Sequence, residues 1–388
     1  MTIAEPKKIV LLVDDAPANI RMATAMLRDA YEIRSATDGA MALDLARATP
    51  APDLILLDVM MAGMDGYEVC TRLKADPETR DIPVIFVTGQ TEITDESKGF
   101  QVGAVDYIHK PFSEAIVLAR VHTHLTLQGV RQQLAQQLRT FKDELETARR
   151  VQLSILPREI PRIEGLDIAA RYLPMASVAG DFYDFIVVDE KRIGILVADV
   201  SGHGMPAALI ASMLKIALGA QFPHASEPAQ VLAGLNQTLC GKFYEHYVTA
   251  AYVFINMQDR TLKYAGAGHP PLLLYDGSTG TSREVEKNGL VLSCFPDETY
   301  SDVELPLATR DWIVLFTDGI AEARNPLKEQ FGYVRLKQSL EHHSGASAGE
   351  FANVLLCEVS RWTERPAGEE PDDDVTIVAV HVDDRAKC

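Results

Sequence analysis

The chain has 388 residues, of which 47% are hydrophobic and 24% are charged, and this composition excludes a largely disordered protein. Acidic residues outnumber basic ones by 55 to 37, which gives a net charge of −18. That balance excludes a protein that coats nucleic acid, because phosphate backbones demand clustered Lys and Arg.

Residues 1–125 alternate short apolar runs with amphipathic stretches, a pattern typical of a doubly wound α/β domain with a parallel sheet. We expect strands at 9–13, 53–57, 83–87 and 107–108, with helices at 18–27 and 40–48. Polar residues follow the apolar runs. Because ligands bind at the carboxyl ends of parallel strands, these residues mark a candidate site: Asp14, Asp15, Asp58, Thr88 and Lys110.

The residue types at this edge indicate phosphoryl chemistry. Carboxylates that converge repel one another unless a cation lies among them, and all-oxygen ligation favours Mg²⁺. A hydroxyl and an ammonium group would contact an anion delivered to one Asp, so we expect a carboxylate that is phosphorylated, with Lys110 as its charge partner. The alternative for any single Asp is a turn residue or a helix cap, but five polar positions ending four strands are hard to obtain by chance.

On these five residues the segment resembles the receiver domain of two-component response regulators. The resemblance implies that Asp58 accepts phosphate from a histidine kinase. It also implies that Asp15, Asp58 and the Met60 carbonyl hold Mg²⁺, and that Asp14 assists this metal site through water.

The same resemblance implies roles for the residues that end the last two predicted strands. Thr88 and Lys110 would contact the phosphoryl group, and the Lys110–Pro111 peptide bond would be cis. Tyr107 would be the switch aromatic residue of the family. A tyrosine packed at the edge of the surface is the alternative for Tyr107.

Residues 126–156 predict a helical coiled-coil linker that forms a homodimer. Residues 113–156 hold no proline, and apolar residues recur at alternating spacings of three and four. A weak coil of this kind suits a switch, because a small free energy can bias it. The alternative is a single amphipathic helix lying on the core of its own domain. The repeat consists of Leu127, Leu134, Leu138, Phe141, Leu145, Ala148 and Ile155, with His124, Arg131 and Gln152 as polar positions.

Residues 157–388 predict a second, larger domain of α+β class. Strand-like stretches at 249–257, 261–265 and 272–275 and helical stretches at 205–218, 228–243 and 348–362 occur in runs rather than in strict alternation. Such runs favour antiparallel layers over a parallel sheet.

Acidic residues again lie at the ends of predicted strands in this domain. The clusters occupy 180–184, 199–204, 317–319 and 371–376, and glycines beside several carboxylates allow backbone carbonyls and water to approach. No cysteine or histidine pair accompanies them, so we expect an all-oxygen site for Mg²⁺ or Mn²⁺. A single Asp-Gly pair would be a turn, but four clusters in one domain favour a metal site.

These clusters resemble the metal-dependent serine/threonine protein phosphatases (the PPM family), in the bacterial branch that regulates sigma factors. The resemblance covers about residues 153–382 and implies a β-sandwich of two antiparallel sheets flanked by helices. The strings that carry it are Ala-Gly-Asp-Phe-Tyr-Asp, Ala-Asp-Val-Ser-Gly-His-Gly, Gly-Ala-Gly-His-Pro-Pro, Phe-Thr-Asp-Gly and Asp-Asp-Val-Thr.

By this resemblance, Asp199 bridges two metals and the Val200 carbonyl is a further ligand. Asp181, Asp318 and Asp373 complete the site, directly or through water, with two or more Mn²⁺ or Mg²⁺ ions. A water between the metals then attacks phosphorus in line, with Asp199, Asp318 and Asp373 as the catalytic carboxylates.

Asp184, Asp374 and His203 carry two interpretations each. Asp184 and Asp374 either hold the ligands in place or serve as turn residues and helix caps. His203 comes two residues later than the histidine that eukaryotic relatives use as a proposed acid, so a loop role is the alternative, and we expect His269 to be structural. No arginine matches the one that holds substrate phosphate in eukaryotic members.

The predicted function is a response regulator whose Asp58 phosphorylation controls dephosphorylation of phosphoserine or phosphothreonine on a protein. By resemblance, the substrate is a phosphorylated anti-sigma-factor antagonist. The alternative is a catalytically inactive adaptor that binds a sigma factor or its regulator. The five cysteines are scattered, and the most apolar helical stretch, 207–218, is short and holds Lys215, so we expect a cytoplasmic protein with no membrane partner.

Overall fold

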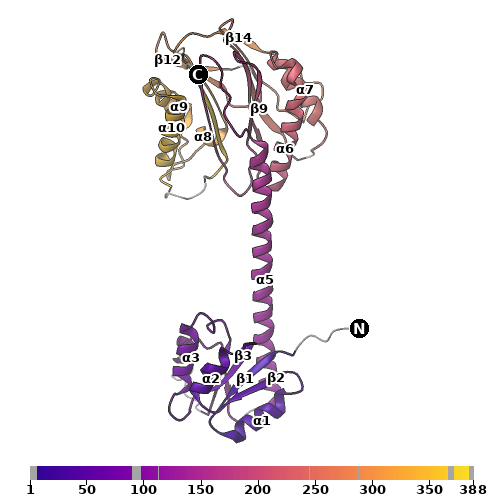
Figure 1. The fold of residues 1–388 in the computed structure, drawn as a ribbon, viewed down its shortest axis with the longest axis vertical. Helices are drawn as coiled ribbons and strands as arrows, with labels where there is room; N and C mark the ends of the chain where they lie inside the picture. The colour runs from indigo at the N-terminus through magenta and orange to yellow at the C-terminus, as the bar shows by residue number, and fades with distance from the viewer. Residues whose placement is uncertain are drawn as a thin grey trace. The chain divides into compact units, whose positions relative to one another are not determined.

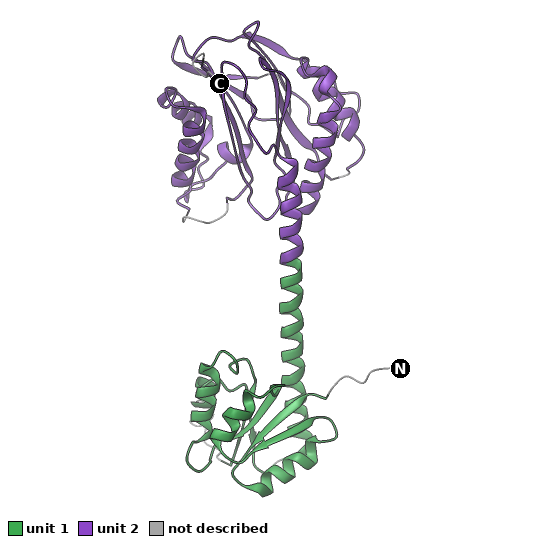
Figure 2. Cartoon of the chain, viewed as in Figure 1, with its two compact units in different colours: residues 1–141 green, residues 142–388 purple. Residues whose placement is uncertain are grey.

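The computed structural model describes residues 7–89, 98–111, 113–243, 245–286, 288–365 and 371–383. The chain divides into two compact units, residues 1–141 and residues 142–388 (Figure 2). One long helix, α5 (Glu114–Ile155), begins in the first unit and ends in the second.

The first unit is a parallel sheet of five strands in the order β2-β1-β3-β4-β5, with all the pairs parallel. This order confirms the predicted doubly wound α/β class. Strands β1, β3 and β4 are buried along their whole length, which is why their sequences are continuous apolar runs. The elements are β1 (Ile9–Val13), α1 (Pro17–Leu27), β2 (Glu32–Ala36), α2 (Gly39–Ala46), β3 (Leu54–Asp58), α3 (Gly66–Ala75), β4 (Val84–Thr88) and β5 (Asp106–His109).

Helix α5 is buried at its two ends and exposed in its middle. Val117, Val121 and Leu125 pack into the core of the first unit, whereas every residue of 131–144 is exposed. Four of the predicted seam residues, Leu127, Leu134, Leu138 and Phe141, are each more than 50% exposed. The middle of the helix therefore presents an apolar row that its own chain does not cover.

The two ends of the predicted repeat serve other contacts. His124 lies 3.0 Å from Asp106 of β5, and Gln152 is buried within the second unit. For these two polar positions the coiled-coil assignment is wrong, because each side chain is held by its own chain.

The second unit is a sandwich of two mainly antiparallel sheets, which confirms the predicted α+β class. Its core lies between the sheets, where Ile195 and Val253 of one sheet share a cluster with Ile313 and Val378 of the other. One sheet has the order β13-β10-β9-β8-β7, with β14 beside β10, and the other has the order β12-β11-β15-β16-β6. The strands are β6 (Leu166–Leu173), β7 (Phe182–Asp189), β8 (Arg192–Val200), β9 (Val248–Asn256), β10 (Thr261–Ala267), β11 (Leu272–Asp276), β12 (Thr281–Val285), β13 (Asn288–Gly289), β14 (Val303–Pro306), β15 (Trp312–Phe316) and β16 (Val375–Val382).

Helices cover the outer faces of this sandwich. Figure 1 shows α6 and α7 beside the β8–β9 sheet, and α9 and α10 beside the β15–β16 sheet. Helix α10 begins with a capping box, in which the Ser347 hydroxyl accepts from Glu350 N and the Glu350 carboxylate accepts from Ser347 N. The helices are α6 (Met205–Gly219), α7 (Pro228–Leu239), α8 (Asp318–Ala321), α9 (Gly332–His342) and α10 (Ala348–Trp362), with a short 3-10 turn at Phe222–His224.

One predicted helix is too long. The pattern at 228–243 extends past Leu239, but α7 ends there because Cys240 leaves the helical conformation with a ψ of 134° and Gly241 has a φ of 73°. Within the described residues, no helix combines the length and the apolar character needed to cross a membrane.

Candidate functional site

Three carboxylates meet at the carboxyl edge of the first unit's sheet. Asp14 and Asp15 follow β1, and Asp58 ends the neighbouring strand β3. Their ligand oxygens all lie within 4.8 Å of one another, a spacing that one Mg²⁺ can satisfy. Across the described ranges, no other trio of His, Cys, Asp or Glu is this tight.

Lys110, just after β5, reaches the same edge. Its Nζ donates to Asp14 Oδ2 and to Asp58 Oδ2, each at 2.9 Å. Burial disfavours the charged form of Lys110, but the two carboxylates outweigh burial and raise its pKa. Burial raises the pKa of Asp58, against the effect of Lys110. The ammonium group therefore lies where it can pair with an anion carried by Asp58.

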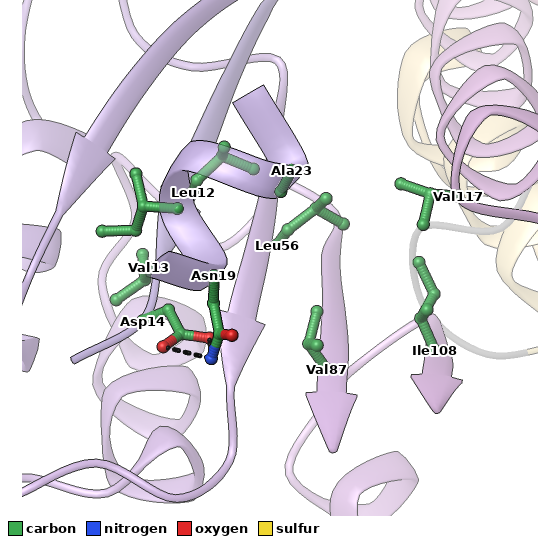
Figure 3. A pocket seen from close by; sticks show the side chains of 10 residues that line it. Leu12, Val13, Asp14, Asn19, Ala23, Leu56, Val87, Ile108 and Val117 are labelled. Carbon is green, nitrogen blue, oxygen red and sulfur yellow. Dashed lines mark hydrogen bonds between the residues drawn. The ribbon is translucent and has the colours of Figure 1, made fainter. Parts of the chain in front are cut away.

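Asn19, which the sequence did not single out, holds Asp14 from α1. Its Nδ2 donates to both Asp14 oxygens at 2.9 Å (Figure 3). Beside this pair lies a mostly apolar cavity of about 20 Å³, bounded by residues such as Leu56 and Val117, with room for about one water molecule. The cavity is too small for an organic ligand.

The other predicted residues of this unit take different positions. Thr88 ends β4 and is buried, and Met60 follows Asp58 in an exposed turn. Tyr107 is 4% exposed, with its ring centroid 5.4 Å from that of Phe86. Its ring is therefore part of the core and not a surface edge. The Lys110–Pro111 bond is cis, as predicted.

In the second unit, the predicted acidic residues lie at the ends of strands from both sheets. Asp181 directly precedes β7 and Asp199 lies near the end of β8, in one sheet. Asp318 follows β15, and Asp373 precedes β16, in the other sheet. Each sheet thus contributes two of the four predicted carboxylates.

Hydrogen bonds between the sheets fix Asp181, which is 2% exposed. Its Oδ2 accepts from Thr317 Oγ1 at 2.8 Å and from Thr376 Oγ1 at 2.6 Å. Thr317 immediately precedes Asp318, and Thr376 closely follows Asp373. Both threonines fall within the predicted acidic clusters at 317–319 and 371–376, but no role was predicted for either of them.

Burial and then neighbouring carboxylates raise the pKa of Asp181, Asp199 and Asp318. Burial raises the pKa of Asp199 to about 7, with further contributions from Asp318 and Asp373. Burial and then the charge of Asp199 raise the pKa of Asp181 well above its usual range. Burial and then Asp373 raise the pKa of Asp318. Divalent cations would relieve this repulsion, so the residues fit a metal centre of hard oxygen ligands.

The backbone around the predicted carbonyl ligand, Val200, is closely packed and hydrogen-bonded. Gly180 lies so close to it that a Cβ atom there would be 2.7 Å from the Val200 carbonyl oxygen. After Val200 the chain is fixed by Ser201, whose N donates to Tyr247 O at 2.9 Å and whose Oγ accepts from Tyr247 N at 2.8 Å. A ring nitrogen of His246 lies 2.7 Å from Ser201 O.

The two acidic residues with two interpretations, Asp374 and Asp184, have different hydrogen-bond partners. Asp374 is buried and accepts from Met175 N at 2.8 Å and from Gly180 N at 2.6 Å, so it ties the segment before Asp181 to the other sheet. Asp184 accepts from Lys215 at 2.7 Å.

The two histidines differ in burial. His203 is exposed in the loop before α6. His269 is buried with Nδ1 2.8 Å from Thr249 Oγ1, and burial lowers its pKa to about 3.

Gln152 is a further residue that sequence reasoning placed elsewhere. It is 5% exposed and pairs with the backbone of Ala179, two residues before Asp181. Its nearby sequence gave no signal, because a glutamine in a heptad pattern looks the same whether it faces a second helix or its own domain.

Two family models match the chain. The model described as Stage II sporulation protein E (SpoIIE) matches residues 189–383, and the response regulator receiver domain matches residues 10–122. The SpoIIE match covers half of the chain and contains Asp199, Asp318 and Asp373.

Named relatives match the two parts separately. "Phosphoserine phosphatase RsbU" of Bacillus subtilis is 36% identical over 236 residues, which is 60% of this chain and 67% of that protein. "Response regulator PleD" of Caulobacter vibrioides is 46% identical over 115 residues, 29% of this chain and 25% of that protein. The solved "SiaA-PP2C domain of Pseudomonas aeruginosa" has a TM-score of 0.57 at 24% identity, covering 63% of this chain and 98% of that one, so it shows a shared fold.

Proposed function

The chain belongs to the Stage II sporulation protein E (SpoIIE) family and is a protein serine/threonine phosphatase with a receiver domain, and we propose that phosphorylation of Asp58 controls it. The observation that carries the catalytic half is the set of carboxylates at the ends of strands from both sheets, with Asp181 hydrogen-bonded across the sheets to Thr317 and Thr376. The observation that carries the control half is Asp58 beside two carboxylates and Lys110.

The catalytic centre would hold two or more Mn²⁺ or Mg²⁺ ions. Asp199, the Val200 carbonyl, Asp181, Asp318 and Asp373 would be their ligands, directly or through water. Such metals supply an activated water and offset the charge of the phosphoryl oxygens. Asp374 keeps the segment that carries Asp181 in place through its two backbone hydrogen bonds.

The receiver centre would hold one Mg²⁺ through Asp15, Asp58 and the Met60 carbonyl, with Asp14 assisting through water. A histidine kinase supplies the phosphate to Asp58. Lys110 and Thr88 then contact the phosphoryl group, and Tyr107 reports the change to the rest of the unit.

The proposed substrate is a phosphorylated anti-sigma-factor antagonist, and the proposed setting is the cytoplasm. The support is the similarity to a phosphatase named RsbU over 60% of this chain, together with the scattered cysteines. We keep the predicted limits of 1–125, 126–156 and 157–388 for receiver, linker and phosphatase as part of this proposal.

The chain forms a homodimer through the middle of α5. The exposed row of Leu127, Leu134, Leu138 and Phe141 supports this assembly, because parallel helices bury such a row against each other. Sedimentation of the full chain should give a dimer, and Leu134→Glu with Leu138→Glu should shift it toward monomer. Gln137→Glu, also on the exposed middle of the helix, should leave the dimer intact.

Hydrolysis of p-nitrophenyl phosphate by the purified full chain with Mn²⁺ tests the catalytic half. We expect turnover that depends on Mn²⁺ and is lost in Asp373→Ala. Asp372→Ala is the matched control, because this neighbouring carboxylate is exposed and pairs with Arg365 at 2.8 Å. A folded wild type without turnover on p-nitrophenyl phosphate and on a serine-phosphorylated antagonist would favour an inactive adaptor instead.

A further inference from the structure

The two halves of the metal centre lie on different sheets, and two threonine hydroxyls connect them. Asp181 belongs to the β7 side, while Thr317 and Thr376 belong to the β15–β16 side. Both hydroxyls bond the same atom, Asp181 Oδ2, at 2.8 and 2.6 Å. All three residues are buried, at 2% exposed or less.

The direction of these hydrogen bonds is fixed by the rest of the network. Thr317 Oγ1 accepts from Thr376 N at 2.9 Å, so its own hydrogen is free for Asp181. Thr317 N in turn donates to Thr376 O at 3.0 Å. A backbone ladder therefore sets the positions of both hydroxyls, and both donate toward one carboxylate oxygen.

We infer that Thr317 and Thr376 are positioning residues for metal binding, which hold Asp181 Oδ2 so that Oδ1 is presented to the metal. The inference rests on the proposed metal centre. It differs from the ligand assignment itself, because both hydroxyls donate to Asp181 and neither is among the proposed ligands. Partners of this kind orient ligating groups, and their loss typically weakens metal affinity about 10- to 100-fold.

Thr376→Val is the informative substitution, because valine has nearly the shape of threonine without the hydroxyl. Thr317→Val is less clean, since it also removes the acceptor of Thr376 N. Thr376→Ser keeps a hydroxyl and should restore function if the hydrogen bond is what matters. Thr238→Val is a matched control, because this hydroxyl of the same unit donates to Gly234 O at 2.8 Å within α7, away from the predicted ligands.

The experiment is a titration of Mn²⁺ into the full chain. Binding is monitored by calorimetry and by the electron paramagnetic resonance signal of free Mn²⁺. All proteins carry Asp15→Asn, which removes the proposed receiver site, and folding is checked by circular dichroism. We expect Thr376→Val to bind Mn²⁺ at least about 10-fold more weakly, with Thr376→Ser and Thr238→Val close to the parent. In an Asp181→Asn background, Thr376→Val should cause no further loss, because its effect passes through Asp181.

Equal Mn²⁺ affinity in folded Thr376→Val and the parent would overturn the inference and leave the metal centre standing. The inference would also be overturned if Thr376→Val and Thr376→Ser weakened Mn²⁺ binding equally. It would be overturned as well if Thr376→Val caused its full loss of Mn²⁺ affinity in the Asp181→Asn background. If the parent itself binds no Mn²⁺, the proposed metal centre fails and the inference fails with it.

Discussion

Gln152, near the end of α5, makes two hydrogen bonds to the backbone of Ala179 through its side-chain amide. Its Nε2 donates to Ala179 O at 2.5 Å, and Ala179 N donates to its Oε1 at 3.0 Å. The next residue, Gly180, donates to Asp374, and Asp181 follows. The helix that leaves the receiver is thus bonded, within the second unit, to the segment that places a predicted metal ligand.

Gln152→Ala should lower both the stability of the second unit and its turnover. The substitution leaves a buried backbone donor and acceptor without this partner, at a cost of about 2 kcal/mol. Urea unfolding and hydrolysis of p-nitrophenyl phosphate measure the two effects. Gln137→Ala, on the exposed middle of the same helix, is the control and should change neither. A Gln152→Ala protein with wild-type stability and turnover would show that the hydrogen bonds between Gln152 and Ala179 contribute to neither.

Lys110→Met should destabilise the metal-free receiver and make it more responsive to Mg²⁺. Lys110 pairs with Asp14 and Asp58, whose side chains are 9% and 7% exposed, so its removal leaves buried charges close together. We expect a loss of about 2 kcal/mol in urea unfolding with a chelator present, most of it recovered when Mg²⁺ is added. Lys74→Met, also in this unit but away from the carboxylate edge, should show no such recovery. An equal effect of Mg²⁺ on both variants would contradict this account.

The stability of the second unit should fall in acid because of His269. Its pKa is lowered from 6.5 to about 3, so the folded state holds it neutral while the unfolded chain takes up a proton below about pH 6.5. This contribution is present above pH 6.5 and is lost as the pH falls toward 3. His269→Asn removes the titrating group, so the stability advantage of the wild type should shrink by about 2 kcal/mol between pH 7.5 and about pH 5. A constant difference in urea unfolding over that range would refute the assignment.

Metal should stabilise the second unit more at pH 8 than at pH 5.5. Without metal, Asp199 has a pKa raised from 3.8 to about 7, so its contribution to stability is present below pH 3.8 and is lost as the pH rises through about 7. Bound cations replace the proton in that upper range. The increase in unfolding temperature on exchanging EDTA for Mn²⁺ should therefore grow with pH, and Asp199→Asn should flatten this growth. An increase that is the same at both pH values would count against Asp199 as a ligand.

Much of the fold was predictable because the strands are continuous buried runs. The predicted strand at 9–13 coincides with β1, and the predicted helix at 348–362 coincides with α10. Glu32–Ala36 was not predicted, since this edge strand is largely exposed and lacks an apolar run. The end of α7 was misplaced, because the backbone turn at Gly241 breaks the helix before its apolar pattern ends.

The acidic residues of the site could be listed from sequence, but their supports could not. Asp181, Asp199, Asp318 and Asp373 each lie in a short string with a recognisable pattern. Thr317, Thr376 and Gln152 act across sheets or across sequence separations such as 195 residues, from Asp181 to Thr376. Contacts of that kind depend on strand order, which a single sequence does not reveal.

The most direct test of the central claim is the rate of p-nitrophenyl phosphate hydrolysis with Mn²⁺, in the presence and absence of beryllofluoride, for wild type and Asp58→Asn. Beryllofluoride mimics the phosphoryl group on a carboxylate, and the amide of the variant cannot hold it in the same way. The account predicts that beryllofluoride changes the rate of the wild type and leaves the rate of Asp58→Asn unchanged. An active wild type that ignores beryllofluoride, or the same response in both proteins, would contradict control of the phosphatase through Asp58.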